Sequence, residues 1–170
     1  AYFRPNPSTY SGFDTGAGGG NTAELAETDP VVNSGHGRSV KFTSTDPSKK
    51  VQANNLHSPI SSGYAVYEMD FCVEDFLQPR CFMETQYTSS AWSGSDYLYV
   101  STSGDFSVGS EGEAIGKCNS LQWYNIKRVV DFSRNTSYLF LDNKLISKVT
   151  ASYITEIIKP VFSAIGGTVS

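Results

Sequence analysis

The stretch from Tyr64 to Val73 is the part of the sequence that most limits the folds open to this chain. Its residues fall into two alternating sets, one apolar and one richer in polar side chains. A period of two is that of a β-strand with one face on a core and the other toward solvent. The core-facing set is Ala65, Tyr67, Met69, Phe71 and Val73, and the opposite set is Tyr64, Val66, Glu68, Asp70 and Cys72.

Further short strands are predicted on both sides of this segment, separated by turn-forming pairs such as Gly104-Asp105 and Asp142-Asn143. They cover residues 39–42, 81–87, 97–102, 106–109, 123–132, 137–141, 145–149 and 161–165. Two segments carry helical signals instead, one turn over residues 22–28 and a short helix over residues 152–159. Many short strands with turns between them predict an all-β fold, an antiparallel β-sandwich.

The length of 170 residues predicts one domain over residues 1–170, large enough to fold without disulfides or metals. Residues 1–33 are expected to be irregular, because Pro5, Pro7 and the glycines between Gly16 and Gly20 interrupt regular structure. Charged residues make up only 18% of the chain, below the roughly 25% of typical soluble domains. Ser, Thr, Gly, Asn and Tyr take their place.

The charge balance argues against nucleic acid as a partner. The formal net charge is −4, and the basic pairs Lys49-Lys50 and Lys127-Arg128 are too short to follow a phosphate backbone, so we interpret both as solvated charge. No apolar run reaches the ~18 residues of a membrane span. The chain starts at Ala1 without a basic-then-apolar leader. A processed or excised domain of an extracellular or particle-surface protein fits these features.

Three cysteines, Cys72, Cys81 and Cys118, are an odd number and show no metal-binding spacing. Cys72 belongs to the polar set of its strand, whereas Cys81 shares a phase with Met83, so we predict no disulfide between them. The redox state of the three thiols is otherwise open. The triplet Asn135-Thr136-Ser137 is an N-glycosylation sequon in a predicted turn, which makes Asn135 a candidate glycan acceptor.

Residues 123–132 and 138–146 carry a resemblance to a known group of proteins. Trp123 opens a strand, and the return strand reads Leu141-Asp142-Asn143-Lys144, with Asn where the group often has Gly. With the segment 36–42 and the strand from Tyr64, this pattern resembles the concanavalin A-like lectin/glucanase superfamily, which includes the laminin-G-like modules. The resemblance covers roughly residues 31–149 and implies a jelly roll of two curved antiparallel sheets. It fixes no activity.

Glu68 and Asp70 share the polar face of the long strand, with Glu74 in the same phase. Glucanases of the superfamily place carboxylates as Glu-x-Asp-x-Glu or Glu-x-Asp-x-x-Glu, positions that Cys72 and Val73 fill here. Glu74 would lie roughly 20 Å from Glu68 along an extended strand, whereas retaining glycosidases need carboxyls about 5–5.5 Å apart. We interpret these carboxylates as a solvated polar face and, second, as ligand contacts.

The aromatic-rich segment from Tyr87 to Tyr99 is the best candidate for ligand binding. Trp92 lies in a Ser/Gly loop, where its indole is either packed on the core or exposed for stacking against a sugar ring. Asp96, Tyr97 and Tyr99 would supply polar partners. Trp123 is expected in the core, whereas Tyr138 and Phe140 are expected on an outer or concave face that a partner covers.

These observations favour a non-catalytic carbohydrate-binding or adhesion module of lectin-like type. A structural surface domain of a larger assembly, such as a virion or cell-surface array, is the second interpretation, and a polysaccharide hydrolase or lyase is the third. The predicted ligand contacts are Tyr87, Trp92, Asp96, Tyr97, Tyr99, Glu68 and Asp70. No cofactor is predicted. The superfamily leaves calcium open, although no loop concentrates oxygen ligands at coordinating spacing.

Overall fold

A computed structural model describes residues 22–26, 39–43, 51–54, 58–92, 96–110 and 112–164. Within them the chain forms twelve strands and one short 3-10 helix, η1 (Phe132–Arg134). The strands are β1 (Thr22–Ala26), β2 (Ser39–Thr43), β3 (Val51–Asn54), β4 (Tyr64–Cys72), β5 (Arg80–Gln86), β6 (Leu98–Val100), β7 (Asp105–Val108), β8 (Ala114–Lys117), β9 (Trp123–Asp131), β10 (Thr136–Leu141), β11 (Lys144–Thr150) and β12 (Lys159–Ala164).

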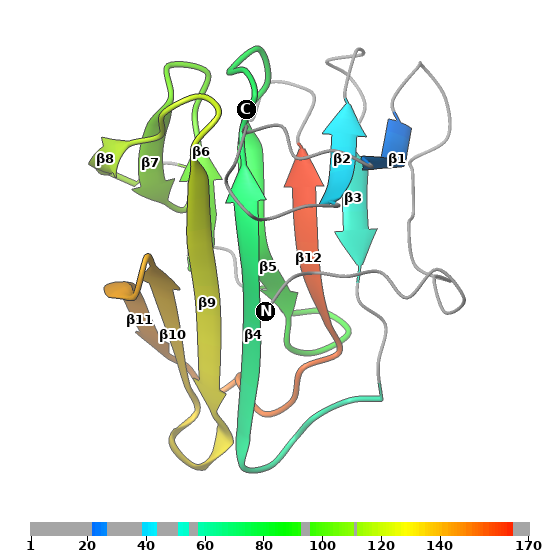
Figure 1. Cartoon of the computed structure of the whole chain (residues 1–170). Helices are drawn as coiled ribbons and strands as arrows, with labels where there is room; N and C mark the ends of the chain where they lie inside the picture. The colour runs from blue at the N-terminus through cyan, green and yellow to red at the C-terminus, as the bar shows by residue number, and fades with distance from the viewer. Residues whose placement is uncertain are drawn as a thin grey trace.

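The strands form an antiparallel β-sandwich, as the sequence predicted. One sheet has the order β11-β10-β9-β4 and the other has the order β3-β12-β5-β6-β7-β8, while β1 and β2 make a separate pair. Figure 1 shows β4 and β9 as long neighbouring strands stacked against the strands of the six-stranded sheet. Each sheet therefore has an inner face toward the other sheet and an outer face.

The core between the sheets follows the alternation of β4. Phe71 and Val73 are buried, whereas Tyr64 and Val66 are 66% and 58% exposed. Phe71 stacks on Phe82 of β5 at a centroid distance of 4.0 Å and lies 5.6 Å from Tyr124 of β9. A second cluster joins Ala65, Tyr87, Val130, Phe132, Ile154 and Ile157 near the opposite end of β4.

The prediction that Trp123 lies in the core was wrong, because the next residue, Tyr124, takes that place. Cys72 pairs with Trp123, and Phe71 with Tyr124. Because Phe71 and Tyr124 are core residues, Trp123 lies on the outer face, where it is half-buried. Tyr124, 6% exposed, provides the buried aromatic ring at this end of β9.

Both helical predictions were also wrong. Residues 22–26, within the segment expected to be irregular, form β1 and pair with β2; the rest of residues 1–33 lies outside the described residues. Residues 152–155 form a turn, and Ile157 then bridges to Ile60. Ile154 and Ile157 are fully buried, so a turn followed by a bridge satisfies the same spacing that suggested a helix. The strands β3 and β8 were not predicted.

A bulge in β5 changes the predicted phase of Cys81. Met83 has a φ of 61°, and the pairing with β12 shifts register beside it, so that Phe82 and Met83 both reach the core. Cys81 pairs with Tyr99 and lies on the outer face of the six-stranded sheet. Cys72 lies on the outer face of the other sheet, and the structure records all three cysteines as thiols.

Candidate functional site

The predicted ligand contacts lie in three separate places. Tyr87 and Asp96 point into the core and are 1% and 2% exposed. Glu68 and Asp70 lie on the outer face of the four-stranded sheet. Trp92, Tyr97 and Tyr99 belong to the outer face of the six-stranded sheet, and this is the largest group that the fold brings to one surface.

Tyr87 and Asp96 both contact Arg128, a fully buried arginine of β9. Arg128 Nη1 donates to Asp96 Oδ2 at 2.5 Å, to Tyr87 Oη at 3.1 Å and to Ser137 Oγ at 2.8 Å. Arg128 Nη2 donates to the carbonyl oxygens of Asp96, at 2.6 Å, and of Met83. The prediction that Arg128 is solvated was therefore wrong.

Electrostatics in this cluster favour the charged guanidinium. Burial by itself lowers the pKa of Arg128, but the carboxylate of Asp96 and the hydroxyl of Tyr87 outweigh burial and raise it. Burial raises the pKa of Tyr87, so its hydroxyl stays protonated. Because Tyr87 and Asp96 stand at the two ends of the loop that carries Trp92, one guanidinium ties both ends of that loop to the core.

Backbone contacts fix the first half of this loop. Tyr87 N and Thr88 N both donate to the carbonyl of Ala91, at 3.0 and 3.4 Å, and Ala91 N donates to Thr88 Oγ1 at 3.1 Å. The chain thus turns back on itself, and Trp92 forms an antiparallel bridge with Gln86 of β5.

Trp92 is 39% exposed and stands at the end of a row across the sheet. Gln86 pairs with Trp92 on one side and with Lys159 of β12 on the other. Residues directly opposite one another on antiparallel strands point to the same face. The ammonium of Lys159 accordingly lies over the Trp92 ring, 5.3 Å from its centroid, which is within cation–π range.

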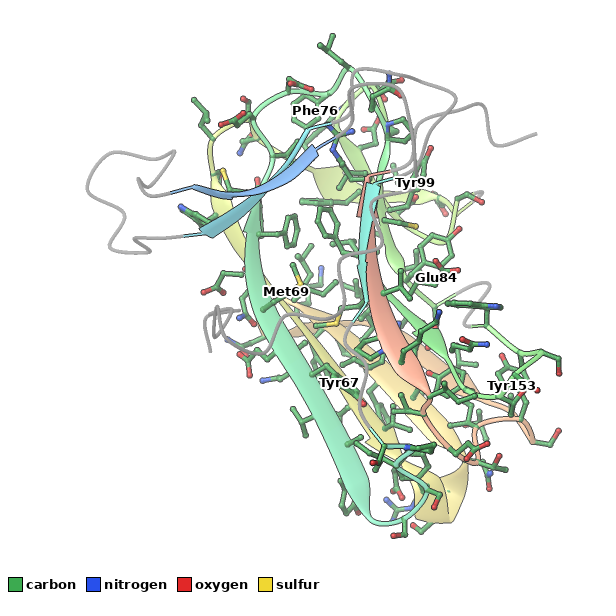
Figure 2. The ribbon with its side chains drawn as sticks, turned by 90° about the vertical axis from the view of Figure 1, so that its right-hand side faces the viewer. Tyr67, Met69, Phe76, Glu84, Tyr99 and Tyr153 are labelled. Atoms are coloured by element: carbon green, nitrogen blue, oxygen red, sulfur yellow. The ribbon has the colours of Figure 1, made fainter. Side chains whose placement is uncertain are left out.

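Tyr97 and Tyr99 extend this outer face along β6. Tyr99 is half-buried, while Tyr97 is 9% exposed and its hydroxyl accepts a hydrogen bond from Ser110 N at 3.1 Å. Burial, and then the nearby Cys81, raises the pKa of Tyr99. Figure 2 shows Tyr99 and Glu84 on the side of the six-stranded sheet away from β4, whereas Tyr67 and Met69 lie between β4 and β12.

The residues Gln86, Lys159, Trp92, Glu84 and Tyr99 are called the Trp92 face below. Sequence reasoning missed Gln86 and Lys159. Their place beside Trp92 follows from the register of β5 with β12, which the local pattern around Lys159 does not encode. Tyr97 and Tyr99 were among the predicted ligand contacts, as polar partners in the aromatic-rich segment from Tyr87 to Tyr99.

The carboxylates of β4 have structural neighbours. Asn125 Nδ2 donates to Asp70 Oδ1 at 2.8 Å, and Glu68 stands opposite Lys127 of β9. Glu74 follows the end of β4 and is exposed. The structure thus places Glu68 and Asp70 on the opposite side of the molecule from Trp92.

The outer face of the four-stranded sheet also carries exposed apolar side chains. Leu145 of β11 is 47% exposed, and Tyr64 and Val66 at the other edge are more exposed still. Tyr138 and Phe140 lie on this outer face, as expected, beneath the ammonium groups of Lys148 and Lys127 at 5.9 and 5.8 Å.

Asn135 is half-buried where η1 meets β10, with a φ of 48°. Its Nδ2 donates to the carbonyl of Ile154 at 2.9 Å, and Ser137, the third sequon residue, is fully buried against Arg128. Because its amide is held against Ile154, Asn135 is poorly presented for the attachment of an N-linked glycan.

Two further features bear on partners and cofactors. Among the described residues, no group of three or more His, Cys, Asp or Glu side chains is arranged to hold a metal ion. In the same part of the chain, no helix combines the length and apolar character needed to cross a bilayer.

Comparisons with solved structures identify similar folds. A sialidase superposes with a TM-score of 0.57 at 15% identity, covering 74% of this chain and 12% of the sialidase, so this chain spans a small part of that protein. The globular domain of T. cruzi calreticulin gives 0.50 at 10% identity, covering 86% and 74%. A carbohydrate-binding module of Bacillus subtilis, CBM66, gives 0.44 at 15% identity, covering 86% and 91%, a score too low to carry an argument.

Identities this low show the fold alone. These two scores of 0.50 or more agree with the β-sandwich described above. Searches with the sequence found no matching protein family and no matching characterised protein.

Proposed function

We propose that this chain is a non-catalytic carbohydrate-binding or adhesion module of the concanavalin A-like superfamily that binds saccharide on the Trp92 face. The observation that carries the proposal is the half-exposed indole of Trp92, aligned with the polar side chains of Gln86 and Lys159 on one sheet face. An exposed aromatic ring with a few placed polar groups is the usual composition of a small-ligand site.

Each part of this face has a defined chemical task. The indole offers an apolar surface to the C–H bonds of a sugar ring, while the amide of Gln86 and the ammonium of Lys159 supply donors for sugar oxygens. Tyr99 pairs with Cys81, which lies about 15 Å from Gln86 along β5 at a strand rise of ~3.3 Å per residue. The face is therefore long enough for an oligosaccharide.

The loop geometry supports the proposal energetically. Arg128 holds both ends of the loop, and the Trp92–Gln86 bridge holds its middle, so the indole is positioned before a ligand arrives. A side chain that is already ordered loses less conformational entropy on binding. The stacking energy of the sugar is then not offset by the cost of ordering the Trp92 side chain.

Glycan-array binding by the wild type, followed by affinity measurements on Trp92→Ala, tests the proposal. We expect binding to weaken by at least tenfold, as for an interface hot spot, while the melting temperature stays within a few degrees. Tyr64→Ala is the control, because it removes an exposed aromatic ring from the opposite sheet, and it should leave glycan binding unchanged. An array without any bound glycan, or equal losses in both variants, contradicts the proposal.

A second candidate function is a structural surface domain of a larger assembly, such as a virion or cell-surface array. The exposed apolar side chains on the four-stranded sheet favour it, since clustered exposed apolar residues mark interaction surfaces. Both candidates fit an extracellular or particle-surface location, which we propose with them. A polysaccharide hydrolase or lyase has less support: Glu84 is the one carboxylate among the five residues of the Trp92 face, whereas most glycosidases use a pair.

A further inference from the structure

We infer that the Trp92 face selects acidic saccharides, with Lys159 as the residue that recognises a sugar carboxylate. This inference rests on the proposed function and names its ligand class. Its basis is the geometry of one pair, in which the ammonium of Lys159 is held 5.3 Å from the centre of a half-exposed indole.

Lys159 differs from three other basic side chains in having no carboxylate partner among the described residues, and from Lys127 and Lys148, which also lie over aromatic rings, in standing on the Trp92 face. Lys117 lies 2.6 Å from Asp105, Arg134 lies 3.2 Å from Asp131, and Arg80 lies 3.6 Å from Asp75. Within the part of the chain that the structure describes, no carboxylate is within ion-pair distance of Lys159. Its charge is available to an anion from outside.

The neighbourhood of Lys159 matches the two sides of an acidic sugar. A uronic or sialic acid residue has an apolar C–H surface and a carboxylate on the same ring. Stacking of that surface on the part of the indole that Lys159 leaves exposed brings the carboxylate to the ammonium above the ring. A charge-assisted hydrogen bond of this kind is roughly twice as strong as a neutral one.

The rest of the face limits where the anion can sit. Glu84 lies on the same face, two residues before Gln86 on β5, and the chain as a whole carries a net charge of −4. Long-range electrostatics therefore repel a polyanion. The preference must come from short-range contact with Lys159, which stands directly opposite Gln86.

Pairs of saccharides that differ only in the carboxylate test this directly. Calorimetry would compare oligogalacturonate with its methyl ester, and sialyllactose with lactose, so that the two arms distinguish a uronic from a sialic acid source. For the wild type we expect the acidic member of at least one pair to bind about tenfold more tightly, the scale of one charge-assisted contact.

Three variants assign that preference to Lys159. Lys159→Gln should abolish the difference between acidic and neutral members, and Lys159→Arg should retain it. Lys148→Gln is the matched control, because Lys148 also covers an aromatic ring, Tyr138, but on the other sheet; it should leave the preference intact.

The outcomes separate this inference from the proposed function. The inference is overturned if neutral and acidic members bind equally, or if the preference for the acidic member survives Lys159→Gln. In either case, binding that depends on Trp92 still supports a saccharide-binding module. A wild type that binds none of the four probes and no glycan on an array overturns both.

Discussion

At the scale of single residues, Arg128 links the two sheets through buried hydrogen bonds and an ion pair. It belongs to β9 of the four-stranded sheet, and its partners Asp96, Tyr87 and Met83 belong to β5, or to the loop between β5 and β6, in the other sheet. The contact is fully buried, so it is not weakened by solvent as surface ion pairs are.

Replacing Asp96 with Asn should therefore destabilise the chain strongly. The substitution keeps the shape but leaves the guanidinium buried without its counter-charge, which typically costs about 3–5 kcal/mol. Urea denaturation measures the change.

The control for this prediction is Asp105→Asn, which removes one partner of the exposed ion pair with Lys117. Its urea midpoint should stay close to that of the wild type. A midpoint for Asp96→Asn as high as that of the control would show that the Arg128 cluster contributes little to stability.

The placement of Tyr87 and Asp96 shows a limit of sequence reasoning at this scale. Both stand in a polar, aromatic-rich segment, and that composition suits a ligand site and a buried polar cluster equally well. What distinguishes the two is the partner, Arg128, which is distant in sequence and adjacent only after the sheets stack. The same holds for Lys159 beside Trp92.

At the scale of elements, the strand β9 was predicted correctly, but the side of it expected to face the core was wrong at Trp123. The strand, its length and its turn to β10 follow from local alternation and turn residues. The face depends on pairing with β4, which puts Tyr124 rather than Trp123 against Phe71.

Tyr124→Ala should for this reason destabilise the chain more than Trp123→Ala. Tyr124 contacts Phe71 and Phe106 in the core, and its hydroxyl accepts a hydrogen bond from Asn119 N at 2.7 Å. Removing a buried aromatic ring costs about 3–5 kcal/mol, whereas Trp123 is half-buried on the outer face. Chemical denaturation of the two variants side by side measures the difference, and a reversed order would contradict this assignment of faces.

The sequence-based strand prediction failed at edge strands and at bulges. β8 (Ala114–Lys117) is short, fully exposed, and contains Gly116, so it has no alternation to detect. β5 alternates until its bulge at Met83, after which the phase changes without any Gly or Pro to signal it. Long half-buried strands such as β4 can be predicted from their own alternation. The formation of edge strands and bulges depends on the strands that pair with them.

At the scale of the whole molecule, the sandwich keeps several ionisable side chains neutral. Burial raises the pKa of Tyr67 from 10.0 to about 12, with Tyr87 adding to the shift. Burial, with Cys72 nearby, raises the pKa of the Cys118 thiol from 9.0 to about 12.

Stability should accordingly fall as the pH rises from about 9 toward 12. In that window the unfolded chain has lost protons that the folded chain still holds, so each step in pH favours unfolding. Urea midpoints measured at about pH 8 and about pH 11 test this. Tyr67→Phe, which cannot ionise, should show a smaller drop, and a wild-type midpoint that stays constant over this range would contradict the prediction.

The tie between Arg128 and both ends of the Trp92 loop has a consequence for how such a module can diversify. The residues between Tyr87 and Asp96 can change in length and composition while their two anchor points stay fixed in the core, because longer loops add only slowly to the cost of closure. Under the proposed function, the preference for one saccharide could then be changed by loop grafting without redesign of the sandwich. A grafted loop would have to preserve the contacts of Arg128 with Tyr87 and Asp96, since these fix both ends of the loop to the core.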